Sequence, residues 1–133
     1  MPYSGAVRRW DIYWADLEPA VGSEQRGERR PVIVVSNDGV NANLAVVTVV
    51  PATKAEGKKR KLYPFEVLLP AGTITNAHAS VIMPYQIRTI SKMRLIERIG
   101  RLEHPVYRDQ IENRLLEHLD IAFEEELPSE PES

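Results

Sequence analysis

The sequence predicts a β-rich α+β domain with one C-terminal helix, and two patterns lead to this prediction. Short apolar runs, rich in β-branched residues, recur over residues 10–102 and are separated by Pro, Gly, Asn and Asp. Over residues 105–123 the apolar positions instead recur every four residues, as on one face of a helix. At 133 residues the chain can bury a sizeable core, and we expect residues 1–123 to form a single domain.

Composition narrows the class of protein. Hydrophobic residues make up 43% and charged residues 27% of the chain, as in ordinary soluble globular proteins. The absence of cysteine excludes disulfides and thiolate metal sites, and we expect no metal and no cofactor. No apolar run approaches the ~18 residues of a membrane span. The N-terminus lacks the basic and apolar regions of a signal peptide. We therefore expect a cytoplasmic protein with no membrane contact.

The charge is unevenly distributed. The formal net charge is −2, but residues 124–133 hold five acidic residues and no Lys or Arg. This segment is predicted to be an acidic, disordered tail. The rest of the chain carries all 17 basic residues but only 14 of the 19 acidic ones. A mildly basic body of this kind permits nucleic-acid binding.

Three strands are predicted in the first part of the chain. The first spans 10–17, with Trp10, Ile12 and Trp14 on one face. The second spans 31–36 and the third 44–50, joined by a turn-rich segment over 37–43, so the two form an antiparallel hairpin. Paired positions should then sum to roughly 80–83, which places Arg30 opposite 50–53 and beside Thr53.

The second part is predicted to alternate short strands with turns and to end in the helix. We expect strands over 63–69, 79–83, 86–90 and 96–102, with a helical turn over 91–95 that Ser91 caps. The helix begins at Pro105 and extends to 123. The apolar face that it packs on the sheet comprises Tyr107, Ile111, Leu115, Leu119 and Phe123.

A polar loop over 22–30, with two glycines, two glutamates and three arginines, runs straight into the second strand. Such a loop indicates a site on a rigid scaffold, although a solvated surface loop has the same composition. Arg30 has the planar fork that suits phosphate, Thr53 offers a hydroxyl, and Glu24 is the nearest carboxylate that can accept a proton. The basic residues around them are Arg26, Arg29, Lys54, Lys58, Lys59, Arg60 and Lys61.

This grouping can bind a phosphodiester and stabilise charge that develops on it. An equally weighted alternative is purely structural: Arg30 pairs with Glu24 or Glu28, and Thr53 caps a turn. Other site signatures are absent, including a phosphate-binding glycine loop and a dinucleotide fingerprint. The three histidines lack metal-ligand spacing, and only His78, in a polar loop, remains a candidate site residue.

Several motifs together resemble the MazF/PemK toxin family. They include Gly-Ser-Glu-Gln at 22–25, Arg-Pro-Val at 30–32, Pro-Ala-Thr at 51–53, Tyr-Pro-Phe-Glu-Val at 63–67 and Gln-Ile-Arg-Thr at 86–89, and the likeness runs unbroken over about 9–120. The resemblance implies a small SH3-like antiparallel barrel with a C-terminal helix. It also implies a homodimer that cleaves single-stranded RNA at specific sequences without a metal.

The resemblance assigns roles to individual residues. It implies that Arg30 and Thr53 are catalytic, that Glu24 assists them, and that Gln86 and Arg88 contact RNA. Where family members often carry an aspartate before Gln-Ile-Arg, this chain has Tyr85. A cognate antitoxin with an acidic, partly disordered segment is the expected partner.

The reaction follows from what the candidate site lacks. With no cysteine, clustered histidines or paired carboxylates there, we expect the RNA 2′-hydroxyl to be the nucleophile. The products would be a 2′,3′-cyclic phosphate and a 5′-hydroxyl. Two alternatives remain open: a toxin of the same fold that poisons DNA gyrase, as CcdB does, and a catalytically silent RNA-binding module.

Overall fold

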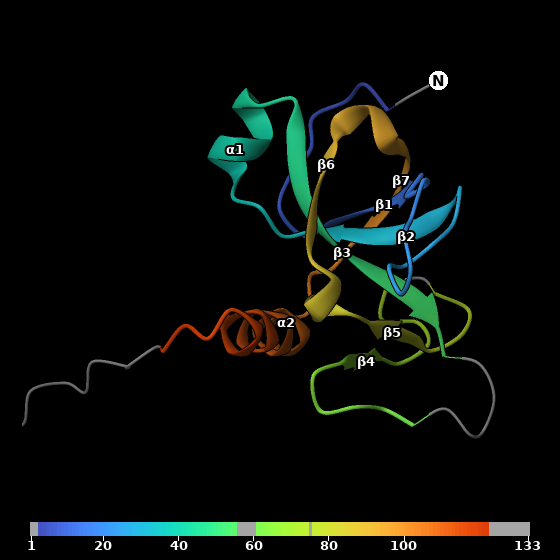
Figure 1. Cartoon of the computed structure of the whole chain (residues 1–133), viewed down its shortest axis with the longest axis vertical. Helices are drawn as coiled ribbons and strands as arrows, with labels where there is room; N and C mark the ends of the chain where they lie inside the picture. Colours follow the sequence, from blue (N-terminus) through green and yellow to red (C-terminus); the bar gives the residue numbers. More distant parts are fainter. Residues whose placement is uncertain (1–2, 56–60, 75, 123–133) are drawn as a thin grey trace, which may run out of the picture.

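A computed structural model describes residues 3–55, 61–74 and 76–122 of the chain (Figure 1). Within them, short strands precede one long C-terminal helix, as predicted. The elements are β1 (Asp11–Ala15), β2 (Arg30–Val34), α1 (Asp38–Asn43), β3 (Val46–Lys54), β4 (Val67–Leu69), β5 (Ser80–Ile82), β6 (Arg88–Ser91), β7 (Leu95–Arg101) and α2 (Pro105–His118). Two 3₁₀ turns, Pro84–Gln86 and Lys92–Arg94, flank β6.

The strands form one antiparallel, seven-stranded sheet organised around β3. The order is β4-β5-β3-β2-β1-β7, and β6 pairs with the first half of β3. The β2–β3 hairpin pairs Val32 with Pro51 and Val34 with Val49, so paired positions sum to 83. The sequence prediction of this hairpin and its register is confirmed.

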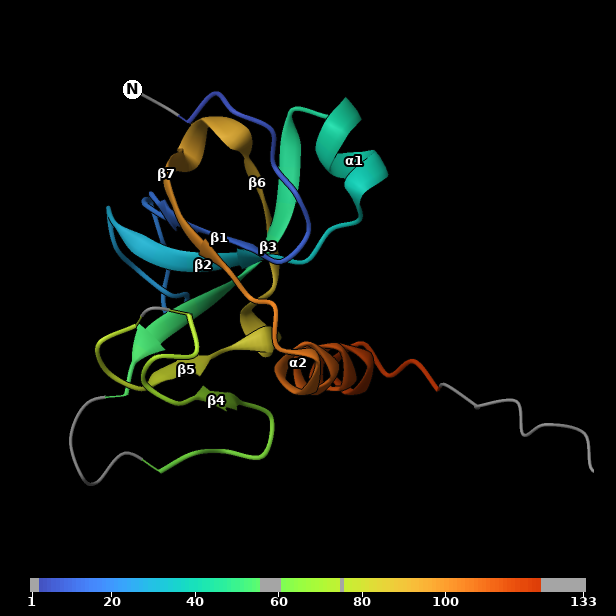
Figure 2. The same cartoon turned by 180° about the vertical axis from the view of Figure 1, so that it is seen from behind.

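Apolar residues on the two faces of the sheet form two cores. The first contains Ile12, Ile33 and Leu102, and α2 covers it with Ile111. The second contains Tyr13, Leu17 and Leu95. Figure 2 shows α2 beside the β4–β5 end of the sheet, away from α1. The helix packs against β4 and the 3₁₀ turn Pro84–Gln86, and this contact fixes the start of the Gln-Ile-Arg motif.

Two local predictions are wrong. The segment 37–43 is the short helix α1, because the Asn37 side chain accepts the Val40 N–H at 2.9 Å and caps a helical turn. The helix α2 ends at His118 rather than 123, because Asp120 adopts a left-handed backbone with φ +55°. The Ile121 N–H then bonds the Leu116 carbonyl, which closes the helix end.

The remaining strand predictions differ mainly in length. The third strand starts at Val46 and runs on to Lys54. The strand expected over 63–69 is limited to Val67–Leu69. The chain turns before it, because the Glu66 N–H donates to the Tyr63 carbonyl at 3.0 Å. Ser91 caps the following 3₁₀ turn as predicted, with its hydroxyl accepting the Met93 N–H at 3.2 Å.

A buried carboxylate fixes the outer strands. Asp11 is 1% exposed, and its oxygens lie 3.1 Å from Arg101 Nη1 and 3.2 Å from Arg98 Nη2. It also accepts the Arg8 backbone N–H at 3.1 Å. A buried charge needs such partners to offset its desolvation, so this cluster ties β1 to β7. No helix among the described residues is long and apolar enough to cross a membrane.

Candidate active site

The β2–β3 hairpin brings Arg30 and Thr53 together. Arg30 opens β2 and Thr53 lies near the end of β3; continuing the register from Val32 and Pro51 by two residues places them opposite each other. Both line a cavity of about 420 Å³. Its other polar or aromatic lining residues in the described part of the chain are Trp14, Arg29, Lys54, Asn76, His78 and Ser80. The predicted proximity of Arg30 and Thr53 is therefore found.

The loop before β2 shapes the Arg30 side chain. Arg30 Nε donates to the Arg26 carbonyl. Gly27 has φ +138°, and a Cβ placed on it would lie 2.6 Å from both Cγ and Nε of Arg30. The backbone conformation favours glycine here, and a side chain at this position would fit only if the Arg30 side chain moved. Arg30 forms no ion pair with Glu24 or Glu28, which are both described, so the structural alternative for Arg30 is wrong.

One wall of this cavity is aromatic. Trp14 on β1 pairs with Pro31 on one side and Glu97 on the other. The Arg29 guanidinium lies 5.0 Å from the Trp14 ring centroid and 3.0 Å from the Glu97 carboxylate. Arg29 is thereby held at the rim by an ion pair and a cation–π contact. The sequence analysis placed Trp14 on an apolar strand face and did not predict its contact with Arg29. The alternation of residues along a strand shows which side chains share a face, but not which of them lie at the edge of the core.

The base of the loop depends on Glu18. Its carboxylate oxygens accept the Gly27 N–H at 2.8 Å and the Ala20 N–H at 3.2 Å. The Leu17 N–H also donates to the Gly27 carbonyl at 2.9 Å. The sequence analysis did not identify Glu18, because these bonds come from a loop that folds back on itself.

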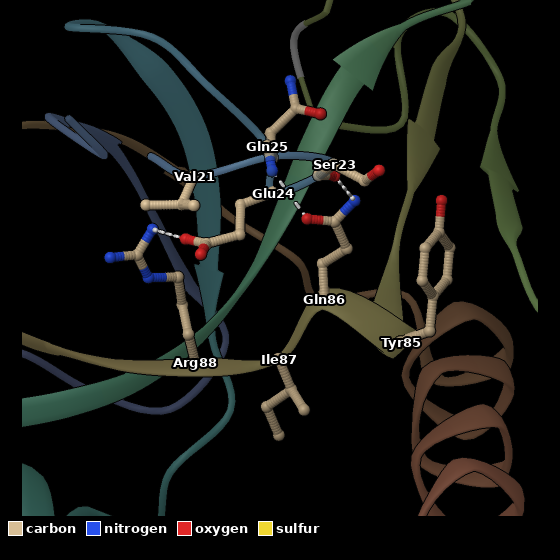
Figure 3. Close-up of a pocket in the computed structure, with 8 residues that line it drawn as sticks. All are labelled: Val21, Ser23, Glu24, Gln25, Tyr85, Gln86, Ile87 and Arg88. Atoms are coloured by element: carbon tan, nitrogen blue, oxygen red, sulfur yellow. Dashed lines mark hydrogen bonds and ion pairs between the residues drawn. The ribbon is translucent and has the colours of Figure 1, made fainter. Parts of the chain in front are cut away.

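Glu24, Gln86 and Arg88 line a second cavity, of about 660 Å³ (Figure 3). Glu24 points toward Arg88, with Oε2 3.9 Å from Nη1. Gln86 binds the loop backbone: its Oε1 accepts the Gln25 N–H at 2.7 Å, and its Nε2 donates to the Ser23 carbonyl at 3.2 Å. The structure thus separates Glu24 from the cavity of Arg30 and Thr53.

Tyr85 lies at the edge of this second cavity. Its ring packs edge-on against Phe65, with centroids 5.0 Å apart, and Phe65 stacks on Tyr63 at 5.3 Å. Phe65 and Tyr63 are each 46% exposed. Tyr85 therefore joins an aromatic cluster next to Gln86.

The other predicted RNA-binding residues lie at the rim of the site or outside the described residues. Arg26 is exposed, with Nη2 3.5 Å from the Gly22 carbonyl. Lys54 is exposed at the end of β3. Lys61 Nζ lies 5.9 Å from the Tyr63 ring centroid. Lys58, Lys59 and Arg60 fall in the undescribed part of the chain, as does the tail 124–133.

His78 and Asn76 enter the Arg30 cavity from the loop before β5. The Asn76 amide Nδ2 donates to the His78 carbonyl at 2.7 Å, and its Oδ1 accepts the Ile74 N–H at 3.1 Å. The sequence analysis kept His78 as a candidate but did not connect it with Arg30. The described residues contain no group of three His, Cys, Asp or Glu side chains able to hold a metal.

Comparison with known proteins identifies the family. Residues 8–119 match the model for PemK-like, MazF-like toxins of type II toxin–antitoxin systems. Endoribonuclease EndoA of Bacillus subtilis (strain 168) is 40% identical over 117 residues, which cover 88% of this chain and 94% of the relative. Endoribonuclease MazF9 of Mycobacterium tuberculosis is 40% identical over 120 residues, covering 86% and 98%.

Solved structures share the fold. A crystal structure of MazF from Deinococcus radiodurans superposes with a TM-score of 0.74 at 24% identity, covering 88% of this chain and 99% of that one. A mycobacterial endoribonuclease in complex with its cognate antitoxin gives a TM-score of 0.70 at 22% identity, covering 90% and 100%. The family model spans nearly all of the described residues, and the chain belongs to the PemK/MazF family of type II toxin–antitoxin toxins.

Proposed function

We propose that this chain, an endoribonuclease by its family and curated relatives, cuts single-stranded RNA at specific sequences without a metal ion. The 2′-hydroxyl attacks the adjacent phosphorus and the bond to the 5′-oxygen breaks. The products are a 2′,3′-cyclic phosphate and a 5′-hydroxyl. The observation that carries this proposal is the meeting of Arg30 and Thr53 in one cavity, across a hairpin of fixed register.

The chemistry of that cavity fits this reaction. Arg30 is a permanent cation whose planar fork can hold two phosphate oxygens, and Thr53 adds a hydroxyl donor. Preorganised donors of this kind stabilise the charge that develops on the phosphorus oxygens. None of the described lining residues is a carboxylate, the ligand type that Mg²⁺ prefers. These features support a nucleophile from the substrate.

RNA contacts extend from this cavity to its neighbours. Arg26, Arg29 and Lys54 lie around the rim, and Lys58, Lys59, Arg60 and Lys61 follow β3 in the sequence. Gln86, Arg88 and Glu24 line the second cavity. We infer that the cations bind phosphates and that the second cavity receives bases, because base contacts carry sequence preference whereas phosphate contacts carry affinity.

The proposed assembly is a cytoplasmic homodimer with an SH3-like barrel of the CcdB/MazF type in each subunit. Support for the barrel comes from β6 and β7, which lie at opposite ends of the strand series β6-β3-β2-β1-β7 yet are joined by three residues. The proposed partner is a cognate antitoxin whose acidic, partly disordered segment covers the basic loops and folds on binding. A mycobacterial structural relative is seen with its cognate antitoxin. A saturating partner that left cleavage unaffected would contradict this inhibition.

The gyrase-poisoning alternative is not favoured, since the curated relatives are named endoribonucleases. The deciding experiment uses an oligonucleotide with one cleavage site, with either ribose or 2′-deoxyribose immediately 5′ of the scissile bond. In excess EDTA the protein should cut only the ribose form. Cleavage of the deoxy form excludes attack by the 2′-hydroxyl, and loss of all cleavage in EDTA shows a metal requirement.

An Arg30→Ala variant is the control for contaminating ribonuclease. Its circular dichroism should match the parent, and its rate should fall ~10²–10³-fold, as for loss of one preorganised donor to a developing anion. A near-normal rate in a folded variant contradicts the assignment of Arg30. Arg30→Lys keeps the charge without the planar fork, and its intermediate rate would measure what the fork contributes.

A further inference from the structure

We propose that His78 is the general base that takes the proton from the attacking 2′-hydroxyl. This inference rests on the proposed function and identifies a group that the reaction still needs. Attack by the 2′-oxygen requires an acceptor for its proton, and Arg30 has no acceptor atom. Glu24, the carboxylate that the family resemblance implies, lines a different cavity and lies 3.9 Å from Arg88, and Glu28 lines neither cavity.

The pairing of β3 with β5 brings the segment that carries His78 to the end of β3 where Thr53 lies. Thr53 pairs with Val81 and Lys54 with Ser80. One step further out, the Ala55 N–H donates to the Ala79 carbonyl at 2.9 Å. His78 is the next residue, and it lines the same cavity as Arg30 and Thr53. The register of two strands therefore determines its place in the site.

The amide of Asn76 braces the loop that presents His78. Nδ2 lies 2.7 Å from the His78 carbonyl, 3.2 Å from the Pro70 carbonyl and 3.4 Å from Ser80 Oγ. Oδ1 accepts the Ile74 N–H at 3.1 Å. Both ends of this amide are therefore engaged in holding the loop, while the exposed side chain of His78 is accessible to a substrate.

Elimination among the described lining residues points to the same group. Arg29, Arg30, Lys54 and the Trp14 indole are donors without an acceptor. The hydroxyls of Thr53 and Ser80 are no more basic than the hydroxyl they would have to deprotonate. The Asn76 carbonyl oxygen is occupied. Among these described residues, only the His78 imidazole offers a ring nitrogen that can accept a proton.

The charged residues around His78 are suited to stabilising the phosphate while His78 accepts the proton. The described cations of the cavity are Arg29, Arg30 and Lys54, and no described carboxylate lines it. Arg29 is already paired with Glu97 at 3.0 Å. Arg30 and Lys54 can thus stabilise the negative charge that grows on the phosphate, while the imidazole accepts the proton.

The proposed step conserves protons and electron pairs. The 2′-oxygen forms a bond to phosphorus as its proton passes to the neutral His78 imidazole. The bond between phosphorus and the 5′-oxygen breaks, and that oxygen takes a proton from water. The imidazolium then releases its proton to solvent. The substrate is converted to a cyclic phosphate and an alcohol, and His78 returns to its neutral form.

The test compares His78→Ala and His78→Gln with the parent in EDTA, on an oligonucleotide with one cleavage site. Both variants should lose ~10²–10⁴-fold in rate, the usual contribution of a positioned base. The parent's rate should rise with pH on the acid side, and both variants should lack this rise. Added imidazole should restore part of the His78→Ala rate. The matched control is His118→Ala, on α2 in a third cavity with Phe65 and Tyr85, which should keep the parent's rate and pH profile.

A second substrate, with sulfur in place of the 5′-oxygen, separates base from acid. A thiolate leaves without a proton, so the His78 variants should remain defective on it. Disappearance of their defect would overturn the assignment by making His78 a proton donor to the leaving group. Parent-like rates and pH profiles in both variants would also overturn it. If the parent itself fails to cut the ribose substrate, the proposed function fails, which is a different result from an unaffected variant.

Discussion

Gln86 holds Gln25 in place: its side-chain oxygen accepts the Gln25 backbone N–H at 2.7 Å, across 61 residues of sequence. With the second bond from Nε2 to the Ser23 carbonyl, it pins the tip of the polar loop to the turn before β6. Sequence resemblance suggested contact with RNA for Gln86. In the structure both ends of its amide are used within the protein, so its first role is to position the loop.

Gln86→Ala should therefore loosen the loop. Losing a buried or half-buried hydrogen bond costs about 0.5–1.5 kcal/mol, so amide exchange at Gln25 should accelerate by roughly threefold to tenfold. Cleavage should fall as well, with global stability little changed. Gln86→Glu keeps the acceptor for Gln25 but loses the donor to Ser23, and should protect the Gln25 amide. Equal exchange rates in the two variants would contradict this assignment.

Gly27→Ala should displace Arg30. The new Cβ would lie 2.6 Å from Arg30 Cγ and Nε, on a backbone with φ +138°. We expect the rate constant of cleavage, measured in single-turnover assays, to fall almost as much as in Arg30→Ala, ~10²–10³-fold. Gly22→Ala is the matched control, since Gly22 has φ +60° but a Cβ added to it would meet nothing within 4 Å. It should lose about 1–2 kcal/mol of stability from the left-handed backbone and retain most activity.

The basic residues 58–61, which follow β3 in the sequence, should govern affinity rather than chemistry. Replacing Lys58, Lys59, Arg60 and Lys61 with Gln should weaken RNA binding, because fewer counterions are released on association. The slope of log affinity against log salt should become shallower by up to ~0.7 for each single-strand phosphate that the variant no longer neutralises. Single-turnover rates at saturating protein should change little. A slope equal to the parent's would show that these four residues do not contact the RNA.

Asp38 should make stability depend on pH. The Arg9 backbone N–H donates to Asp38 Oδ1 at 2.7 Å and holds the pKa of this carboxyl below its ordinary 3.8. The unfolded chain lacks this bond, so the ionised form stabilises the fold above the ordinary pKa. This stabilisation is lost as pH falls through the lower, folded-state pKa. The free energy of unfolding, measured in urea, should be lower for Asp38→Asn than for the parent near neutral pH, and the two values should converge in acid. A constant difference at all pH values would contradict the linkage.

The sequence predicted well what depends on local pattern and strand pairing. Apolar β-branched runs identified β2 and β3. Counting across the turn predicted that paired positions sum to roughly 80–83, which includes the observed 83 and places Arg30 opposite Thr53. Sequence prediction failed where one local signal overrode another. Residues 37–43 have turn chemistry, yet the Asn37 side chain caps a helix. Apolar periodicity continued past the end of α2, which the left-handed Asp120 sets.

The parts of the site that could not be predicted depend on contacts between distant segments. Gln86 meets Gln25, and Arg29 meets both Trp14 and Glu97. The association of His78 with Arg30 needs the β3–β5 pairing, and no turn length in the sequence specifies that pairing. Composition could not separate the two cavities, because it places Glu24 and Arg30 in the same charged loop.

The carboxylate of Glu18 closes the polar loop at its base by holding Ala20 and Gly27. Between these points lie Ser23, Glu24 and Gln25, whose side chains line the second cavity rather than the cavity of Arg30 and Thr53. Substitutions at the tip should therefore change which RNA sequence is preferred more than they change the positions of Arg30 and Thr53.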